Sequence, residues 1–274
     1  MRTCFDFVLF VPLPFFLSGA IPATLALEII DADTGKNISS LVRITDEKKG
    51  VLKIEGLYNR GTGLRRSHPA SQWYCHDGQS KIKGIFGNLK IEAFAGPEYE
   101  MVSVTEQITA GQRIQRKLTA KRIKNPGKNG WRSGNTHLHL MKLAREQADF
   151  YLQTVPRSDG LELVFVSNLR RANAEKEYIT NNHRPADLMK LNTKALKFGW
   201  GEEHRHNYGP GGQGYGHVML LNIKKLVHPV SIGSGIMLEG TDDPPLQKGL
   251  RQARGEGATV VWCHNSFGLE DIPN

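Results

Sequence analysis

A short basic stretch, KRIKNPGKNG (121–130), separates two parts of the sequence whose hydrophobic patterns differ. Before it, β-branched residues alternate with polar residues in short runs, and turn signals such as Asn59-Arg60-Gly61 lie between the runs. After it, apolar runs alternate with amphipathic segments such as KLAREQADFYLQTV, the pattern of strands joined by helices. The stretch itself has the turn-rich composition of an interdomain linker. The sequence therefore predicts an α+β chain of two domains, a β domain followed by a βα-repeating one.

The first part predicts an antiparallel β-sandwich over residues 27–122, with 123–130 as the linker. The runs that carry the alternation are LEIID, LVRITD, VLKIEGLY, KIKGIF, LKIEAFAG, MVSVTEQI and RIQRKLTA. The phrase WYCHDGQSKIKGIFGNLKIEAFAGPEYE resembles the run into the closing hairpin of transthyretin-like and carboxypeptidase-regulatory-like modules. His68 and His76 have too few ligand residues near them for a metal site, so we interpret them as solvated loop histidines.

Residues 1–26 have the pattern of a secretory signal peptide. Arg2 precedes an apolar run from Phe7 to Leu17, and small residues permit cleavage after Ala26 or after Ala20. The apolar run is short and broken by prolines, and no later stretch reaches membrane-spanning length. We therefore expect a secreted or periplasmic protein with no membrane span after the signal is removed.

Composition places the chain among globular proteins but leaves its partner open. Hydrophobic residues make up 39% of the chain and charged residues 23%, which excludes a disordered or fibrous protein. Lys and Arg outnumber Asp and Glu by 36 to 27, and the resulting charge of +9 suits phosphate esters, nucleic acid or an anionic surface. Because no aromatic platform or reading helix flanks the basic linker, we expect a small anionic substrate rather than a specific nucleic acid. The three cysteines are too few for a disulfide scaffold, although Cys75 and Cys263 can pair.

Histidines and glutamates of the second part gather at the edges of predicted strands. His137 and His139 form an HxH pair whose side chains point to the same side of a strand. Either Glu202 or Glu203 can face the pocket of His217, which begins the predicted strand HVMLLNI. His264 follows the apolar run ATVVWC, predicted as a strand of parallel type after a helix over 245–255. Taken alone, each histidine is better explained as a core or surface residue than as a metal ligand, but their common placement at strand edges favours a metal site.

The glycine-rich segment at 209–216 also invites a phosphate-binding loop. It lacks the GK[ST] ending of that loop and runs into a strand rather than a helix. We therefore predict a loop beside the metal site instead.

Together these segments resemble the polymerase and histidinol phosphatase (PHP) superfamily, in particular its exported, carbaryl-hydrolase-like CehA/McbA branch. In that branch a β-sandwich precedes a distorted βα barrel that opens with a GW-S-G-D-x-H-x-H phrase. Here the phrase is Gly130-Trp131 followed by Ser133-Gly134-Asn135-Thr136-His137-Leu138-His139. The resemblance places the family's bridging glutamate on Glu203 and matches its later histidines to His217 and His264. It thus implies the metal ligands His137, His139, Glu203, His217 and His264.

The chain departs from this family in two respects. The family's Asp-His pair after the second strand is replaced by Asn168 and Leu169, and the first aspartate by Asn135. With fewer carboxylates, we expect one or two divalent ions, zinc, manganese or iron. The segment 131–274 holds about 144 residues, fewer than the ~200 of a βα barrel, so we expect a partial, C-terminally truncated barrel.

The resemblance implies a metal-dependent hydrolase. A metal-activated water would attack a phosphoester, carboxyl ester or carbamate-type bond. Arg205 is the candidate for holding an anionic substrate group, and His206 is the candidate proton donor to the leaving group. The alternatives are a degenerate, non-catalytic PHP-like binding protein that retains at most one metal, and a basic nucleic-acid-binding protein.

Overall fold

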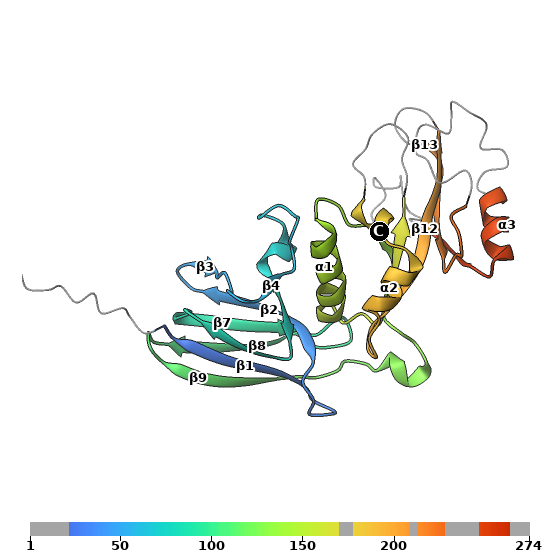
Figure 1. Ribbon diagram of the computed structural model, residues 1–274. Helices are drawn as coiled ribbons and strands as arrows, with labels where there is room; N and C mark the ends of the chain where they lie inside the picture. The colour runs from blue at the N-terminus through green and yellow to red at the C-terminus, as the bar shows by residue number, and fades with distance from the viewer. Residues whose placement is uncertain (1–21, 170–177, 209–212, 228–246, 264–274) are drawn as a thin grey trace, which may run out of the picture.

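The computed structural model describes residues 22–169, 178–208, 213–227 and 247–263, which form a β-sandwich and a second, mixed sheet with helices (Figure 1). The strands of the sandwich are β1 (Thr24–Asp31), β2 (Ser39–Asp46), β3 (Gly50–Val51), β4 (Tyr58–Asn59), β5 (Tyr74–Asp77), β6 (Gln79–Lys83), β7 (Gly87–Phe94), β8 (Val102–Ile108) and β9 (Arg113–Ala120). A 3₁₀ turn, η1 (Pro69–Gln72), precedes β5.

Two sheets enclose the core of the sandwich. One has the order β6-β1-β9, and the other has the order β4-β5-β2-β7-β8 with β3 added to β2. Alternate residues point inward, so Leu25 and Leu27 of β1 face Val42 and Ile44 of β2 across a dry core. This confirms the predicted sandwich. One pair departs from the antiparallel expectation: β9 lies parallel to β1, because the chain crosses from the second sheet to the first after β8.

The first strand begins earlier than the predicted domain boundary. β1 starts at Thr24, and Ala23 and Leu25 are already buried in the core. Cleavage after Ala26 would therefore remove three residues of β1, whereas cleavage after Ala20 leaves the strand complete. Most of the predicted signal peptide, residues 1–21, lies outside the described residues. Among the helices that are described, none is long and apolar enough to cross a membrane.

The second domain is built on a five-stranded sheet with the order β10-β11-β12-β13-β14. Its elements, with the linker turn η2, are η2 (Pro126–Asn129), β10 (Gly134–Leu138), α1 (Arg145–Ser158), β11 (Leu163–Asn168), η3 (Ile179–Asn182), α2 (Pro185–Leu191), β12 (Lys197–Tyr208), β13 (Gln213–Leu221), α3 (Gln247–Gly255) and β14 (Thr259–Trp262). The strands β10, β11 and β12 are parallel, whereas β13 is antiparallel to both β12 and β14. The predicted βα repeat is thus confirmed as far as β12.

After β12 the topology differs from the prediction. Only four residues separate β12 from β13, too few for a parallel crossover, so the two strands form a hairpin. Residues 213–216, predicted as part of a loop, belong to β13. The predicted parallel strand at the end of the chain, β14, instead pairs antiparallel with β13, and its Trp262 is 60% exposed. Over the described residues the sheet is open, with β10 and β14 at opposite edges.

The two faces of this second sheet carry different kinds of side chain. One face is apolar: Val164, Val166, Phe198 and Trp200 pack with the buried residues of α1, α2 and α3 in one core. Since neighbouring residues on a strand point to opposite faces, the residues between these apolar ones point away from the core. The opposite face therefore carries the polar side chains considered next.

Helix α1 lies between the sandwich and the second sheet (Figure 1). At its C-terminal end, Asp159 accepts a hydrogen bond at 2.9 Å from Arg60 Nε of the sandwich. Gly96 and Gly160 meet so closely that a Cβ on Gly96 would lie 2.8 Å from the Cα of Gly160. Both glycines have positive φ, of 105° and 77°, so a larger residue at either position would be strained as well as crowded. The domains are therefore in direct contact through their backbones.

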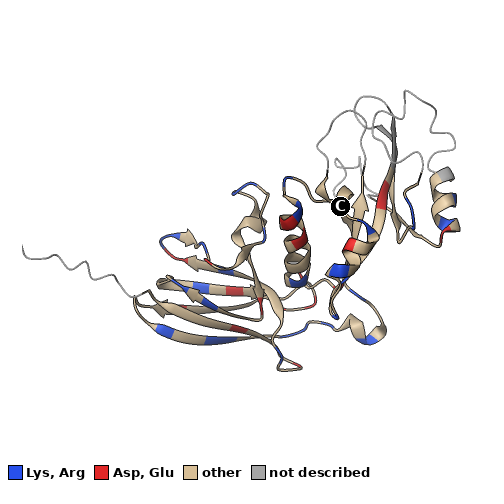
Figure 2. Cartoon of the chain, viewed as in Figure 1, with Lys and Arg blue, Asp and Glu red and all other residues tan. Residues whose placement is uncertain are grey.

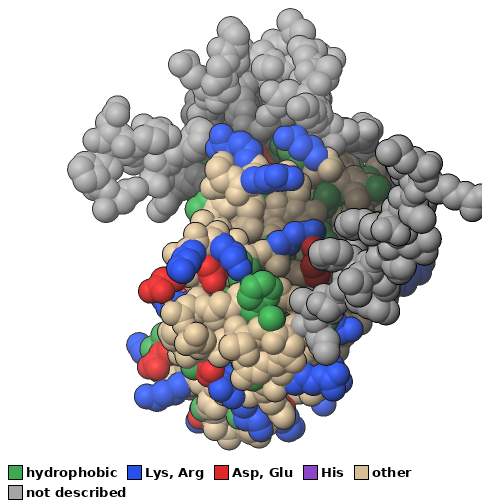
Figure 3. Space-filling model, turned by 90° about the vertical axis from the view of Figure 1, so that its left-hand side faces the viewer, with side chains coloured by type: hydrophobic (Ala, Val, Ile, Leu, Met, Phe, Trp, Pro, Cys, Tyr) green, Lys and Arg blue, Asp and Glu red, His purple; other side chains and the backbone are tan. Residues whose placement is uncertain are grey.

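The positive charge of the chain is spread over the molecule. Lys and Arg occur on the sandwich strands and on the helices of the second domain (Figure 2). On the sandwich-side face drawn in Figure 3, they are interspersed with Asp and Glu rather than gathered into one stripe.

Candidate metal centre

Three histidines converge on Glu203 at the polar face of the second sheet. Nε2 of His137 lies 3.0 Å and Nε2 of His139 lies 2.8 Å from Oε2 of Glu203. Nε2 of His217 lies 3.6 Å from the other carboxylate oxygen, Oε1. The four side chains come from the C-terminal end of β10, from β12 and from β13, so the strand order brings together residues up to 80 positions apart.

The end of β10 is shaped so that both members of the HxH pair reach Glu203. The pairing of β10 with β11 is irregular between Asn135 and Leu138. Within this irregularity, the backbone N–H of His137 donates to the side-chain oxygen of Asn135 at 2.9 Å. Asn135 therefore supports the backbone of the segment that carries His137 and His139.

Glu202 and Glu203 point to opposite faces of β12. Glu202 is fully buried on the helix-covered face, where Oε1 accepts from Nδ1 of His204 at 3.1 Å and Oε2 accepts from the backbone N–H of Val227 at 2.8 Å. Of the two glutamates, Glu203 is thus the one that faces the histidines.

The carboxyl of Glu203 is held in its ionised form. Its burial favours the neutral acid, but the hydrogen bonds with His137 and His139 and the charge of His217 outweigh burial and keep its pKa well below the usual range. A buried carboxylate surrounded by imidazoles is an arrangement that can hold a divalent cation.

The orientation of His139 supports a cation at this position. Its Nδ1–H donates to the backbone carbonyl of Ser167 at 3.0 Å, since a carbonyl oxygen can only accept. Nε2 of the same ring is thereby directed at Glu203, 2.8 Å from its carboxylate, a distance that either a proton on this nitrogen or a cation beside the two atoms accounts for. The ligand atoms of His137, His139 and Glu203 all lie within 4.8 Å of one another, so these residues fit a divalent metal ion.

Cys263 extends this group of ligands. Its sulfur and the ring nitrogens of His137 and His217 also lie within 4.8 Å of one another. Cys75 is buried in β5 of the sandwich, and both cysteines are free, so the disulfide that the sequence allowed between them is not formed. One feature of the sequence could have pointed to Cys263: it directly follows the strand β14 and directly precedes the predicted ligand His264.

Three of the predicted functional residues lie wholly or partly outside the described part of the chain. His264 lies outside the described residues. Arg205 and His206 continue the backbone of β12 beyond Glu203, and their side chains lie outside the described part. In the strand pairing, Arg205 is opposite His217.

The two histidines of the sandwich differ from each other. His68 is exposed and caps η1, where its Nδ1 accepts from the backbone N–H of Ala70 at 3.1 Å. His76 lies in β5 and is fully buried, so its interpretation as a solvated loop histidine is wrong. Three consecutive residues of β5, Tyr74 to His76, are buried, so both faces of this strand are covered, which the sequence alone does not show.

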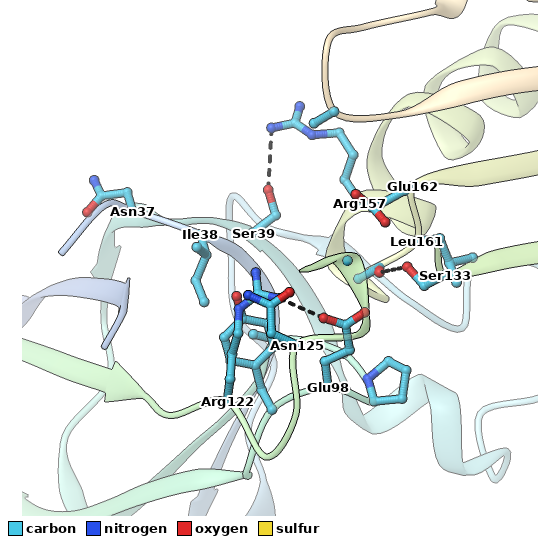
Figure 4. Close-up of a pocket in the computed structure, with 17 residues that line it drawn as sticks. Asn37, Ile38, Ser39, Glu98, Arg122, Asn125, Ser133, Arg157, Leu161 and Glu162 are labelled. Atoms are coloured by element: carbon cyan, nitrogen blue, oxygen red, sulfur yellow. Dashed lines mark hydrogen bonds and ion pairs between the residues drawn. The ribbon is translucent and has the colours of Figure 1, made fainter. Parts of the chain in front are cut away.

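A separate cavity of about 440 Å³ lies between the two domains (Figure 4). Arg157 of α1 and Ser39 of β2 are hydrogen bonded at one side of it, and Arg122 is bonded to Glu98 at another. None of the residues that line this cavity belongs to the metal cluster. Its two arginines are paired with acidic residues, Arg157 with Asp77 and Arg122 with Glu98.

Replacing Asp31, which anchors this cavity wall, is expected to lower the free energy of unfolding by about 2 kcal/mol at pH 7. Burial raises the pKa of Asp31, but hydrogen bonds from Tyr99, Thr34 and Arg122 outweigh it and lower the pKa from 3.8 to about 2. Because the folded pKa is the lower one, this stabilisation is present above about pH 4 and is lost as the pH falls toward 2. Urea unfolding of Asp31→Asn at pH 7 and at low pH checks this, with the exposed Asp33→Asn as the control. A loss of the same size at both pH values would contradict the prediction.

No family model and no curated protein matches the sequence. Among solved structures, the chain is similar to a minor pilin of Streptococcus agalactiae, with a TM-score of 0.29, 13% identity, and coverage of 39% of this chain and 47% of the pilin. It is also similar to a group B streptococcus pilus backbone protein (TM-score 0.26, 13% identity, 36% of this chain and 40% of that one). A third similarity is to catechol 1,2-dioxygenase from Acinetobacter sp. (TM-score 0.24, 11% identity, 40% and 56%). The chain thus spans about half the length of these structures or less.

Proposed function

We propose that this protein is an exported, PHP-type metallohydrolase that cleaves a phosphoester, ester or carbamate-type bond in a small anionic substrate. The observation that carries the proposal is the convergence of His137, His139 and His217 on the buried carboxylate of Glu203. The class of reaction comes from the resemblance of the ligand segments to that family. The site itself supports metal binding.

The residues of the chain have distinct roles in this proposal. Glu203 supplies the negative charge that balances a dication, and the carbonyl of Ser167 holds the ring of His139 in the orientation of a ligand. A divalent ion bound here supplies a water of lowered pKa and a Lewis acid for the scissile oxygen. Arg205 and His206 follow Glu203 on β12, and we assign them to the anionic substrate group and to the leaving group, respectively.

A second candidate is a PHP-like binding protein that holds metal without turnover. Asn168 and Leu169 favour it, because neither supplies the ligands of the family's Asp-His pair. Asn168 is in register with Glu202, on the face of the sheet that the helices cover, and Leu169 is buried. The site therefore has a single glutamate among the described ligands of the cluster.

Metal analysis combined with hydrolysis assays tests both candidates. The full chain is expected to bind zinc or manganese and to hydrolyse at least one of p-nitrophenyl phosphate, p-nitrophenyl acetate and naphthyl methylcarbamate. In His137→Ala, both the bound metal and the hydrolysis are expected to fall to background, because His137 belongs to both groups of ligand atoms. His68→Ala is the matched control, since His68 lies on the surface of the sandwich and its loss leaves the cluster intact.

The outcomes separate the two candidates. Metal bound at His137 without hydrolysis of any substrate would favour the binding protein. A wild-type chain that binds no divalent metal, or a His137→Ala variant that hydrolyses as fast as the wild type, would overturn the metallohydrolase.

A further inference from the structure

We propose that the thiolate of Cys263 is a ligand of the metal centre, and that the centre therefore prefers zinc to manganese. The inference rests on the proposed metal site and adds a sulfur ligand to a set that otherwise consists of imidazoles and one carboxylate. It assigns a function to a cysteine that takes part in no disulfide.

The strand pairing brings Cys263 to the cluster. β14 pairs antiparallel with β13 in a register that sets Trp262 opposite Val218. The backbone N–H of Cys263 continues this pairing and donates to the carbonyl of His217 at 3.3 Å. Val218 belongs to the helix-covered core, so the next pair, Cys263 and His217, turns to the face that carries Glu203.

The contacts of the neighbouring histidine place the sulfur among ligand atoms. The rings of His137 and His217 stack edge to face with their centroids 5.5 Å apart, and ring nitrogens of both lie within 4.8 Å of the Cys263 sulfur. Since His137 also belongs to the group with His139 and Glu203, it joins the two ligand groups. His137, His217 and Cys263 would offer an ion two imidazoles and a thiolate, donors of the kind that zinc sites use.

A thiolate changes which metal the site selects. Sulfur is a soft ligand that favours zinc and cobalt, whereas manganese favours carboxylate and water ligands. With only Glu203 as a carboxylate and Cys263 as a thiolate, the donor set is closer to that of zinc than a site built from several aspartates.

Cobalt spectroscopy of the full chain tests the assignment directly. The chain holds three cysteines, so a Cys4→Ser/Cys75→Ser variant keeps Cys263 as its only thiol. After addition of Co²⁺, this variant is expected to show a near-ultraviolet thiolate-to-cobalt charge-transfer band besides the visible cobalt bands. Adding Cys263→Ser is expected to abolish the charge-transfer band, to lower zinc affinity about tenfold to a hundredfold, and to leave manganese affinity nearly unchanged.

The spectra also distinguish this inference from the proposed function. Visible cobalt bands without a charge-transfer band would overturn the Cys263 ligand and leave the metal centre standing. No cobalt binding at all would overturn both. Equal losses of zinc and manganese affinity in the Cys263→Ser variant would overturn the claim of zinc preference, because they would indicate damage to the fold.

Discussion

Saturating zinc is expected to raise the melting temperature of the second domain by about 5–10 °C, and a chelator is expected to reverse the rise. An ion that binds only the folded state stabilises it by about 2.7 kcal/mol at a hundred times its dissociation constant. For a domain of this size, each kcal/mol shifts the melting temperature by roughly 2–4 °C. The ligand atoms come from β10, β12, β13 and the residue after β14, so unfolding separates them and releases the ion. Calorimetry with and without zinc measures the shift.

Two variants define the source of this shift. His137→Ala is expected to remove most of it, because His137 contributes to both ligand groups. His68→Ala is expected to retain it, because His68 caps a turn of the sandwich. If zinc stabilised His137→Ala as strongly as the wild type, the ion would be bound somewhere other than at this cluster.

The sandwich was predictable because its signal is local. In β1 and β2, every second residue is buried, and in β1 this alternation is visible in the sequence as Leu25, Leu27 and Ile29 at every second position. The parallel pairing of β1 with β9 was not predictable, because it depends on how the chain crosses between two sheets after β8. Alternation specifies which face of a strand is buried but not which strand lies beside it.

In the second sheet, too, the sequence did not determine which strands pair. The run ATVVWC is apolar enough for a central parallel strand, yet β14 pairs with β13 alone among the described strands and leaves Trp262 exposed. An apolar composition cannot distinguish a parallel strand from an antiparallel one. Here the direction of β14 depends on the hairpin of β12 and β13, which reverses the chain before β14 is added. The four-residue connection between β12 and β13 was the available signal for that reversal.

For the candidate site, the ligand types were predictable, but the partner of each ligand was not. The HxH spacing alone predicts that His137 and His139 share a face. That Glu203 rather than Glu202 meets them depends on the phase of β12, which the contacts of Glu202 with His204 and Val227 establish. The approach of Cys263 to His217 could not be predicted, because it requires the pairing of β13 with β14.

Lowering the pH from 7 to 4 is expected to remove about 3 kcal/mol of unfolding free energy through His76 alone. His76 is completely buried, and burial lowers its pKa from 6.5 to about 4, although the backbone of Leu27 and the charge of Asp77 act in the opposite direction. Because the folded pKa is the lower one, the unfolded chain takes up the proton first as the pH falls below 6.5. Stability is therefore lost between about pH 6.5 and pH 4, and below that range His76 contributes no further change.

Urea unfolding of the wild type and of His76→Gln at pH 7 and pH 4 isolates this contribution. The glutamine does not titrate, so the variant is expected to lose about 3 kcal/mol less than the wild type over this range, whatever its stability at pH 7. His68→Gln is the matched control and is expected to behave as the wild type does, because His68 lies exposed on the surface of the sandwich. If His76→Gln and the wild type lost stability equally between pH 7 and pH 4, protonation of His76 would not be the source of the loss and the prediction would be wrong.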